Sequence, residues 1–404
     1  FELDELTLTF TQHTPPSTAT PDPQPQVIPI ALGLIGPDGK EVLETQTVEL
    51  HEETQIIRFT SLEGRPVPSI LRGFSAPIVL EHDLSDADRA HLLAHDTDPF
   101  NRWEAGRTLA RKALLGIIEN GASVDEAYLD GLRAVITDDS LDPAYRALML
   151  GLPSQSDLAN TLYEVGKAPD PAAIYDATET MRDVLASHLK DDLHALYKAN
   201  QVSEPYQPDA EQSGKRSLAN AMLSLITRAE GAELAAQQYA AADNMTQQLA
   251  ALANAIRVGQ GAQMLADFEA QWKDDRLVMD KWFGLQVMEA EPKDAAATAQ
   301  RLTEHPDFNH KNPNRFRAVF GALAMHHAGF HHESGDAYTL LADWLITLDP
   351  INPQTTARMC SAFQTWKRYD ADRQNKIKTE VARILATPDL SRDTTEMLTR
   401  IQGA

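Results

Sequence analysis

The periodicity of the apolar residues changes near residue 80, and this change constrains the fold more than any other feature of the chain. Before it, apolar and polar residues alternate along Leu6–Phe10, Ile30–Leu34 and Val48–Leu50. Period two with Thr, Val and Ile indicates half-buried strands. Pro37-Asp38-Gly39 predicts a hairpin turn, because Pro presets φ and Gly supplies a positive φ. We therefore expect residues 1–80 to form a small antiparallel, Ig-like β-sandwich.

This first segment is rich in proline and short for its predicted fold. It holds ten of the 23 prolines in about a fifth of the chain, and a Pro-rich loop over residues 14–26 joins its first two strands. An immunoglobulin-type sandwich has about 100 residues. We therefore expect the segment to lack its first strand, and we expect a chain that begins in mid-pattern at Phe1 to be cut from a longer protein.

After residue 80 the apolar residues recur every three or four positions, which indicates helices. The two clearest stripes are Trp103, Gly106, Ala110, Leu114 and Ile117, and Met359, Ala362, Phe363 and Trp366. Helix starts recur where Asp or Asn, which cap helices, precedes a Pro that fits the first helical position. These starts are Asp142-Pro143, Asp170-Pro171, Asn312-Pro313 and Asn352-Pro353. Residues 81–404 are thus predicted to form a large all-α, solenoid-like superhelical domain, although no clean repeat period is present.

Charge and cysteine content exclude several classes of protein. The chain carries 59 Asp+Glu against 36 Lys+Arg, a net charge of −23. This balance argues against nucleic acid and anionic membranes as partners, because both attract Lys and Arg. The single cysteine, Cys360, excludes an internal disulfide and any cysteine-based zinc cluster, which fits a reducing compartment. No run approaches 18 apolar residues, and residues 1–5 carry no signal-peptide pattern, so we expect a cytoplasmic protein.

Histidines cluster at His326, His327, His331 and His332, followed by Glu333. Imidazoles and a carboxylate this close together could bind zinc. The spacing does not fit the His-Glu-x-x-His helix of metalloproteases, and Gly329 is expected to end a helix between the two pairs. We therefore expect a solvated turn here, with weak metal binding as the alternative.

Two of the Asn-Pro helix starts carry hydrogen-bond donors off the apolar stripe. Arg317 lies one turn into the first helix, away from the stripe of Phe316 and Phe320. Gln354 and Arg358 are four residues apart and share one face of the second. Guanidinium groups near helix starts suit a carboxylate, but taken by themselves these residues are predicted to be solvated faces.

Five other residues have structural roles in this interpretation. Trp103 and Trp282 are expected in the core, and Asp280 with Lys281 is expected to form an ion pair or to be solvated. Cys360 has no His nearby in sequence, so it is interpreted as a small buried hydrophobic residue. No Ser/His/Asp or Cys/His arrangement is present.

Ordered segments along the whole chain resemble landmarks of the bacterial alanyl aminopeptidase N family. The segments are Asp98–Ala105, Asp243–Thr246, Leu277–Phe283, Asn312–Arg317, Phe330–His331, Asn352–Arg358 and Lys367–Ala371. The resemblance implies a zinc metalloaminopeptidase of the gluzincin type. In that family an N-terminal β domain and a thermolysin-like catalytic domain precede a small β-sandwich and a large helical domain. This chain resembles the last two.

The family's catalytic motifs are missing from this chain. Neither Gly-Ala-Met-Glu-Asn nor His-Glu-x-x-His occurs. The resemblance therefore implies no catalytic residue and no metal ligand here, with the zinc in an absent catalytic domain. Because such a hydrolase needs the metal to lower the pKa of its water, we expect this chain alone to be inactive.

The resemblance also implies a role for the three off-stripe donors. In the family, the helical domain forms a bowl that closes a substrate chamber, and residues matching Arg317, Gln354 and Arg358 face the peptide beyond its N-terminal residue. Arg315 is a weaker candidate, interpreted as a local structural contact. The His326–His327 pair departs from the small and polar residues usual in the family. The implied partners are the missing N-terminal and catalytic domains and short peptides, with no nucleic acid and no membrane.

Composition and periodicity alone permit a second interpretation. A β-sandwich followed by an α-solenoid could be a stand-alone binding or scaffold module without a hydrolase role. An independent enzyme that uses the cluster from His326 to Glu333 is a remote third.

Overall fold

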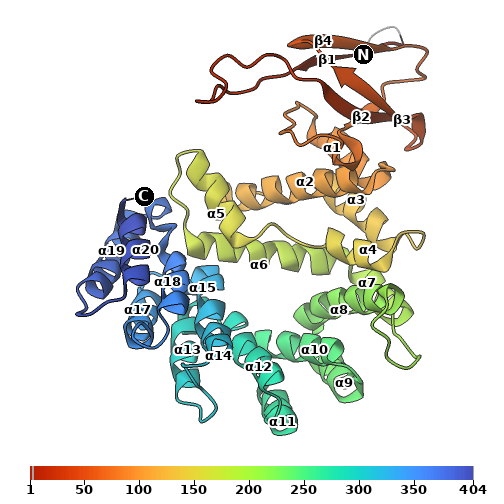
Figure 1. Ribbon diagram of the computed structural model, residues 1–404. Coiled ribbons are helices and arrows are strands. Elements are labelled where there is room, and N and C mark those ends of the chain that lie inside the picture. Colours follow the sequence, from red (N-terminus) through yellow and green to blue (C-terminus); the bar gives the residue numbers. More distant parts are fainter. Residues whose placement is uncertain (2–3, 404) are drawn as a thin grey trace. The chain divides into compact units, whose positions relative to one another are not determined.

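The computed structural model describes Phe1 and residues 4–403, which divide into two compact units (Figure 1). Unit 1 comprises residues 1–116 and 122–152, and unit 2 comprises residues 117–121 and 153–404. The strands and the first helices therefore share one unit.

Unit 1 begins with two antiparallel sheets. One pairs β1 (Leu6–Thr11) with β4 (Thr54–Phe59), and the other has the order β3 (Glu41–Leu50), β2 (Ile28–Ile35), β5 (Val67–Ile70). The three strands expected from period two are confirmed. The predicted turn is also confirmed, because the Gly36 N–H donates to the Lys40 carbonyl at 2.7 Å and Gly39 has φ 79°.

A small apolar core fills the space beside these sheets. Its fully buried members are Ile30, Leu32, Leu50, Leu71 and Ala76, with Phe10, Ile57 and Phe59 packed against them. Side chains from both sheets therefore meet in one core, as in a sandwich.

The expectation that β2 is half-buried is wrong. Residues 30–36 are all buried, including Ala31 and Gly33, which should have faced solvent. The cause is Arg72, whose guanidinium covers the second face of this central strand. A Cβ atom on Gly33 would lie 2.3 Å from Arg72 Cζ, so glycine leaves the room that the guanidinium occupies.

Arg72 is the hub of a buried polar network (3% exposed). It belongs to the short 3-10 helix η1 (Arg72–Phe74). It donates to Glu41, to Ser69 Oγ at 2.9 Å and to Asp96 Oδ1 at 3.1 Å, and Asp96 is itself 2% exposed. The network joins the β3–β2–β5 sheet to the end of the first helix.

Four helices complete the N-terminal part of the chain. They are α1 (Asp86–His95), α2 (Pro99–Asn120), α3 (Glu126–Thr137) and α4 (Pro143–Met149). Ser85 and Asp88 form a capping box that starts α1. Gly106, Ala110 and Leu114 on α2 are buried, as the stripe predicts, but Trp103 is only half-buried. Its ring lies 6.0 Å from the Phe100 ring, beside the buried face of α2. The prediction that Trp103 lies in the core is therefore wrong.

Unit 2 is helical, and its helices pack in pairs (Figure 1). Some pairs are successive, such as α7 with α8 and α9 with α10, and others skip one helix, such as α17 with α19 and α18 with α20. The first eight helices are α5 (Gln155–Glu164), α6 (Pro171–His188), α7 (Lys190–Ala199), α8 (Ala210–Glu230), α9 (Glu233–Ala241), α10 (Met245–Arg257), α11 (Ala262–Trp272) and α12 (Arg276–Met288). The next eight are α13 (Ala295–Thr303), α14 (Pro313–Phe316), α15 (Ala322–Met325), α16 (His327–Phe330), α17 (Asp336–Leu348), α18 (Pro353–Cys360), α19 (Ala371–Leu385) and α20 (Arg392–Gly403). Short 3-10 turns are η2 (Pro292–Asp294), η4 (Ser361–Phe363) and η5 (Trp366–Arg368), and a π-helical turn, η3 (Arg317–Gly321), joins α14 to α15.

The four Asp-Pro and Asn-Pro helix starts are confirmed. Asp142, Asp170, Asn312 and Asn352 each accept a hydrogen bond from a backbone N–H in the first turn of α4, α6, α14 and α18. Each following Pro occupies the first turn, where no N–H partner is needed.

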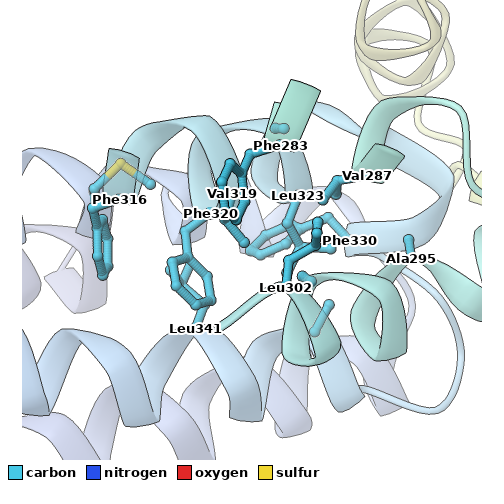
Figure 2. Packing of buried hydrophobic residues seen from close by; sticks show 14 of the residues in the cluster. Phe283, Val287, Ala295, Leu302, Phe316, Val319, Phe320, Leu323, Phe330 and Leu341 are labelled. Carbon is cyan, nitrogen blue, oxygen red and sulfur yellow. The ribbon is translucent and has the colours of Figure 1, made fainter. Parts of the chain in front are cut away.

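One large apolar core runs through unit 2 (Figure 2). Phe316 and Phe320 stack with ring centres 4.7 Å apart, and Phe283 and Trp282 from α12 pack into the same cluster. Trp282 is 5% exposed, so its predicted place in the core is confirmed. Cys360 is fully buried and unpaired with any other cysteine, and burial raises the pKa of its thiol to about 12, as expected for a residue that only packs. Across the described residues, no helix combines the length and apolarity needed to cross a membrane.

Candidate functional site

Arg317 lies at a change of helix type. Asn312 caps α14, its Oδ1 accepting the Asn314 N–H at 3.0 Å, and Arg317 starts the π-helical turn that follows. The side chain is exposed, while Phe316 and Phe320 on the opposite side are fully buried. π-Helical turns are rare and often occur at functional sites. No sequence pattern predicted the π-helical turn at Arg317.

Two hydrogen bonds from Arg317 stay within its own first turn. Nη2 donates to Asn314 Oδ1 at 2.6 Å and Nε donates to the Pro313 carbonyl at 3.2 Å. These bonds orient the guanidinium while other N–H groups face solvent. The arrangement suits a bidentate carboxylate or a peptide carbonyl.

Arg315, two residues earlier, has a different environment. It is 4% exposed, and its Nε donates to Asp280 Oδ1 at 2.6 Å. Its Cζ lies 4.3 Å above the Phe283 ring, a cation–π contact. Its interpretation as a structural contact is confirmed. Of the two alternatives for Asp280 and Lys281, the ion pair is wrong, because adjacent helical residues do not face each other. Lys281 is exposed, as the solvated alternative predicts, whereas Asp280 pairs with Arg315, 35 positions away.

Gln354 and Arg358 share one face of α18, and both side chains are exposed. Asn352 caps this helix through the Thr355 N–H at 3.0 Å, and the opposite face buries Thr356 and Met359. The predicted separation between these polar donors and the core is therefore observed. Arg317 lies on a different helix, and no hydrogen bond joins it to either residue in the described part of the chain.

The solvated turn predicted for the histidines is wrong for three of them. His326, His327 and His331 are 7%, 9% and 5% exposed, and only His332 and Glu333 lie toward the surface. Gly329 does not end a helix but lies inside α16. A Cβ atom there would come within 2.6 Å of Ala295 Cβ, so glycine allows α16 to pack closely against α13. The helix break expected near Gly329 lies earlier, where α15 ends at Met325.

Each buried histidine has its own hydrogen-bond partner. His326 Nδ1 accepts the Gly329 N–H at 3.0 Å, which leaves its Nε2 to donate to the Ala290 carbonyl at 2.8 Å. His331 Nδ1 meets the Tyr338 hydroxyl at 2.8 Å. His327 Nε2 meets the Tyr369 hydroxyl at 3.1 Å. The His327 and His331 rings also contact each other, with ring centres 5.2 Å apart, and His331 stacks on Tyr369 with ring centres 4.0 Å apart. The described residues contain no group of three or more His, Cys, Asp or Glu that could hold a metal ion.

Burial keeps two of these imidazoles neutral. It lowers the pKa of His327 to about 4 and that of His331 well below its ordinary value, and the neighbouring charges of Arg368 and Arg373 act in the same direction. His327 Nδ1 is buried without a partner, so a proton placed there would find no acceptor.

We expect the stability of unit 2 to fall as the pH drops from 6.5 toward 4. The folded pKa of His327 lies below the unfolded value, so the unfolded chain binds more protons in this window and acid favours unfolding. A shift from 6.5 to about 4 corresponds to about 3 kcal/mol for this residue. Urea denaturation at pH 7.5, 6.5, 5.5 and 4.5 measures the free energy of unfolding across this window.

A matched pair of variants assigns that pH dependence. His327→Gln should flatten the loss of stability between pH 6.5 and 4.5, whereas His332→Gln, on the surface turn, should leave it unchanged. Equal unfolding midpoints at pH 7.5 and 4.5 in the wild type, or equal slopes in the two variants, would contradict the assignment.

Comparison with known families covers almost the whole chain. Residues 86–403 match the family described as domain of unknown function DUF3458_C, ARM repeats, and residues 2–83 match domain of unknown function DUF3458, Ig-like fold. The predicted fold class, a small Ig-like segment followed by a superhelical all-α domain, is confirmed.

Three curated relatives carry the name Aminopeptidase N. The relative from Caulobacter vibrioides is 38% identical over 381 residues, 92% of this chain and 44% of its own length. Those from Escherichia coli and Haemophilus influenzae are 34% and 31% identical, over 99% and 97% of this chain and 47% and 46% of their own. The chain thus spans about half the length of the curated relatives it matches.

A solved structure shares the fold along the chain. The crystal structure of Legionella pneumophila aminopeptidase A in complex with aspartic acid superposes with a TM-score of 0.84 at 26% identity. The match covers 99% of this chain and 47% of that one.

Proposed function

Because this chain belongs to the DUF3458_C family and corresponds to the C-terminal part of proteins named Aminopeptidase N, we propose that it is the non-catalytic portion of a zinc-dependent aminopeptidase. The enzyme removes N-terminal residues from peptides in the cytoplasm. One observation carries the proposal: relatives with this name match 92% to 99% of the chain at 31% to 38% identity.

The proposal assigns no catalytic step to this chain. Its described residues offer no metal-ligand set, and its sequence contains no His-Glu-x-x-His motif. The zinc ion and its bound water therefore belong to a part of the enzyme beyond these 404 residues. This portion walls the substrate chamber and binds the peptide.

Arg317, Gln354 and Arg358 are the proposed peptide-binding residues. All three are exposed, stand on helices held by the core, and point away from the buried face. Two guanidinium groups and a carboxamide provide fixed donors for the carbonyls and the terminal carboxylate of a peptide. The net charge of −23 is compatible with the same role, since an acidic protein attracts cationic peptide N-termini by long-range electrostatics.

In the intact enzyme, Arg358→Ala should raise KM for tri- and tetrapeptides about ten- to a hundredfold. A hydrogen bond to a charged group contributes about 1.5–3 kcal/mol, and the peptide loses that contact. Arylamides of alanine or arginine lack the distal groups, so their kinetics should stay unchanged. Steady-state kinetics on both substrate types provides the measurement.

A matched surface variant controls for nonspecific effects. Arg392→Ala removes an arginine on α20 whose side chain is 88% exposed and paired with Glu396. This variant should leave kcat and KM unchanged for both peptides and arylamides. Equal losses on peptides and arylamides in Arg358→Ala would instead assign that residue a structural role.

The helical repeats support a second candidate. Armadillo-type repeats stack into extended binding surfaces in many scaffold proteins, and residues 86–403 match such repeats. A stand-alone scaffold should capture unrelated proteins in a pull-down, whereas the enzyme portion should capture only its catalytic part or short peptides.

A further inference from the structure

An apolar groove crosses the surface of unit 1. It lies between η1, the segment after it and α2, and its volume is about 520 Å³. Its apolar walls include Ile70, Leu71, Phe74, Leu80 and Phe100, and polar groups of Glu81, His82, Arg89 and Glu104 complete the lining. Three large side chains at its edge remain exposed to solvent: Phe74 at 53%, Phe100 at 37% and Val79 at 88%. Contiguous apolar surface of this kind marks an interaction site.

The aromatic rings beside the groove form a row. The Phe74 and Phe100 rings lie 5.7 Å apart, Phe100 and Trp103 lie 6.0 Å apart, and the Arg107 guanidinium sits 5.3 Å above Trp103. The last three residues follow one side of α2 at spacings of three and four. Aromatic residues and arginine are the types that dominate the energy of protein interfaces.

The backbone under Phe74 is strained. Leu71, Gly73 and Phe74 have φ values of 66°, 60° and 52°, and only glycine adopts such values without cost. Hydrogen bonds hold the turn in this conformation. Asp98 Oδ2 accepts the Gly73 N–H at 3.0 Å, and Arg72 donates to Asp96 in the buried network. The strained turn therefore holds the Phe74 ring against Phe100 with 53% of the residue still exposed, where a partner can cover it.

We propose that this groove docks the zinc-bearing part of the same enzyme, through an apolar segment that covers Phe74, Val79 and Phe100. The inference rests on the proposed function. The relatives carry more than half of their length outside the matched region. That length must pack on this portion to enclose a chamber, and unit 1 offers a preformed apolar surface with rigid aromatic anchors for it.

The test compares the 404-residue chain with the intact enzyme by hydrogen exchange. Backbone amides of residues 70–82 should exchange at least tenfold more slowly in the intact enzyme, because the docked segment excludes water from the groove. Amides of β4, where Ile56 is 56% exposed, serve as the internal control and should not change.

Variants tie the protection to the aromatic row. Phe74→Asp combined with Phe100→Asp should restore fast exchange at residues 70–82 in the intact enzyme, whereas Ile56→Asp should not. In the isolated chain the double variant should keep its melting temperature, because both rings lie at the surface, and it should lose the fluorescence of a groove-bound anilinonaphthalene dye.

The outcomes separate the inference from the proposed function. An intact enzyme that hydrolyses arylamides but shows no added protection at residues 70–82 overturns the inference alone. A wild-type intact protein without arylamidase activity overturns the proposed function. If the isolated chain is a dimer by light scattering and the double variant is a monomer, the groove binds a second copy and the inference is wrong.

Discussion

Replacing Arg72 by leucine should cost unit 1 about 3–5 kcal/mol of unfolding free energy, the usual loss when one partner of a buried ion pair is removed. Arg72 and Asp96 are 3% and 2% exposed, and Asp96 Oδ2 already lacks a partner in the wild type. The substitution therefore leaves a buried carboxylate without its cation. Urea denaturation followed by hydrogen exchange of the β2 amides measures the loss.

The pH dependence of that loss identifies its cause. Burial raises the pKa of Asp96 even with the guanidinium present. In Arg72→Leu the folded carboxyl should bind a proton more readily than the unfolded one, so the penalty should be smaller near pH 5 than near pH 8. The double variant Arg72→Leu/Asp96→Leu should regain part of the stability. A loss below about 1 kcal/mol, or a double variant less stable than the single one, would contradict this account.

Arg315→Ala should destabilise unit 2 by a similar amount, about 3–5 kcal/mol, while Arg317→Ala should change stability by less than about 0.5 kcal/mol. The two residues are two positions apart, but Arg315 is buried on Asp280 and Phe283, whereas Arg317 is exposed. Chemical denaturation of both variants provides the comparison.

This pair separates support of the fold from substrate binding. In the intact enzyme, Arg317→Ala should raise KM for peptides without lowering stability, and Arg315→Lys should still lose stability because lysine cannot reproduce the planar guanidinium contact with Phe283. Equal stability losses in Arg315→Ala and Arg317→Ala would show that exposure does not distinguish their roles.

Patterns close in sequence predicted much of this fold. Alternation located β1, β2 and β3, and the Asp-Pro and Asn-Pro pairs located the starts of α4, α6, α14 and α18. Each of these signals depends only on residues within one turn or one strand, which is why the sequence carries them.

Contacts between distant segments could not be predicted in this way. β2 is buried on both faces because Arg72, some 40 positions later, covers Gly33. His327 and His331 are buried against Tyr369, in the segment before α19, and Tyr338 on α17. Asp280 pairs with Arg315 rather than with its neighbour. In each case the deciding partner lies in another element, and periodicity gives no information about it.

The sequence likewise predicted some features of the candidate site and not others. The exposure of Arg317, Gln354 and Arg358 follows from their positions off the apolar stripes, and the structure agrees. Their proposed role in binding peptides rests on resemblance to the family, because no local sequence pattern specifies which ligand an exposed arginine or glutamine contacts. The groove beside Phe74 could not be predicted from the sequence, since no local pattern indicates that Phe74, Val79 and Phe100 share an exposed surface.

The zinc content and arylamidase activity of the purified 404-residue chain test the central claim most directly. We expect less than stoichiometric zinc and no hydrolysis of alanine or arginine arylamides by the chain alone. Stoichiometric zinc and chelator-sensitive hydrolysis should appear once the zinc-bearing part of the enzyme is present. Tightly bound stoichiometric zinc together with arylamidase activity in the chain alone would contradict this claim.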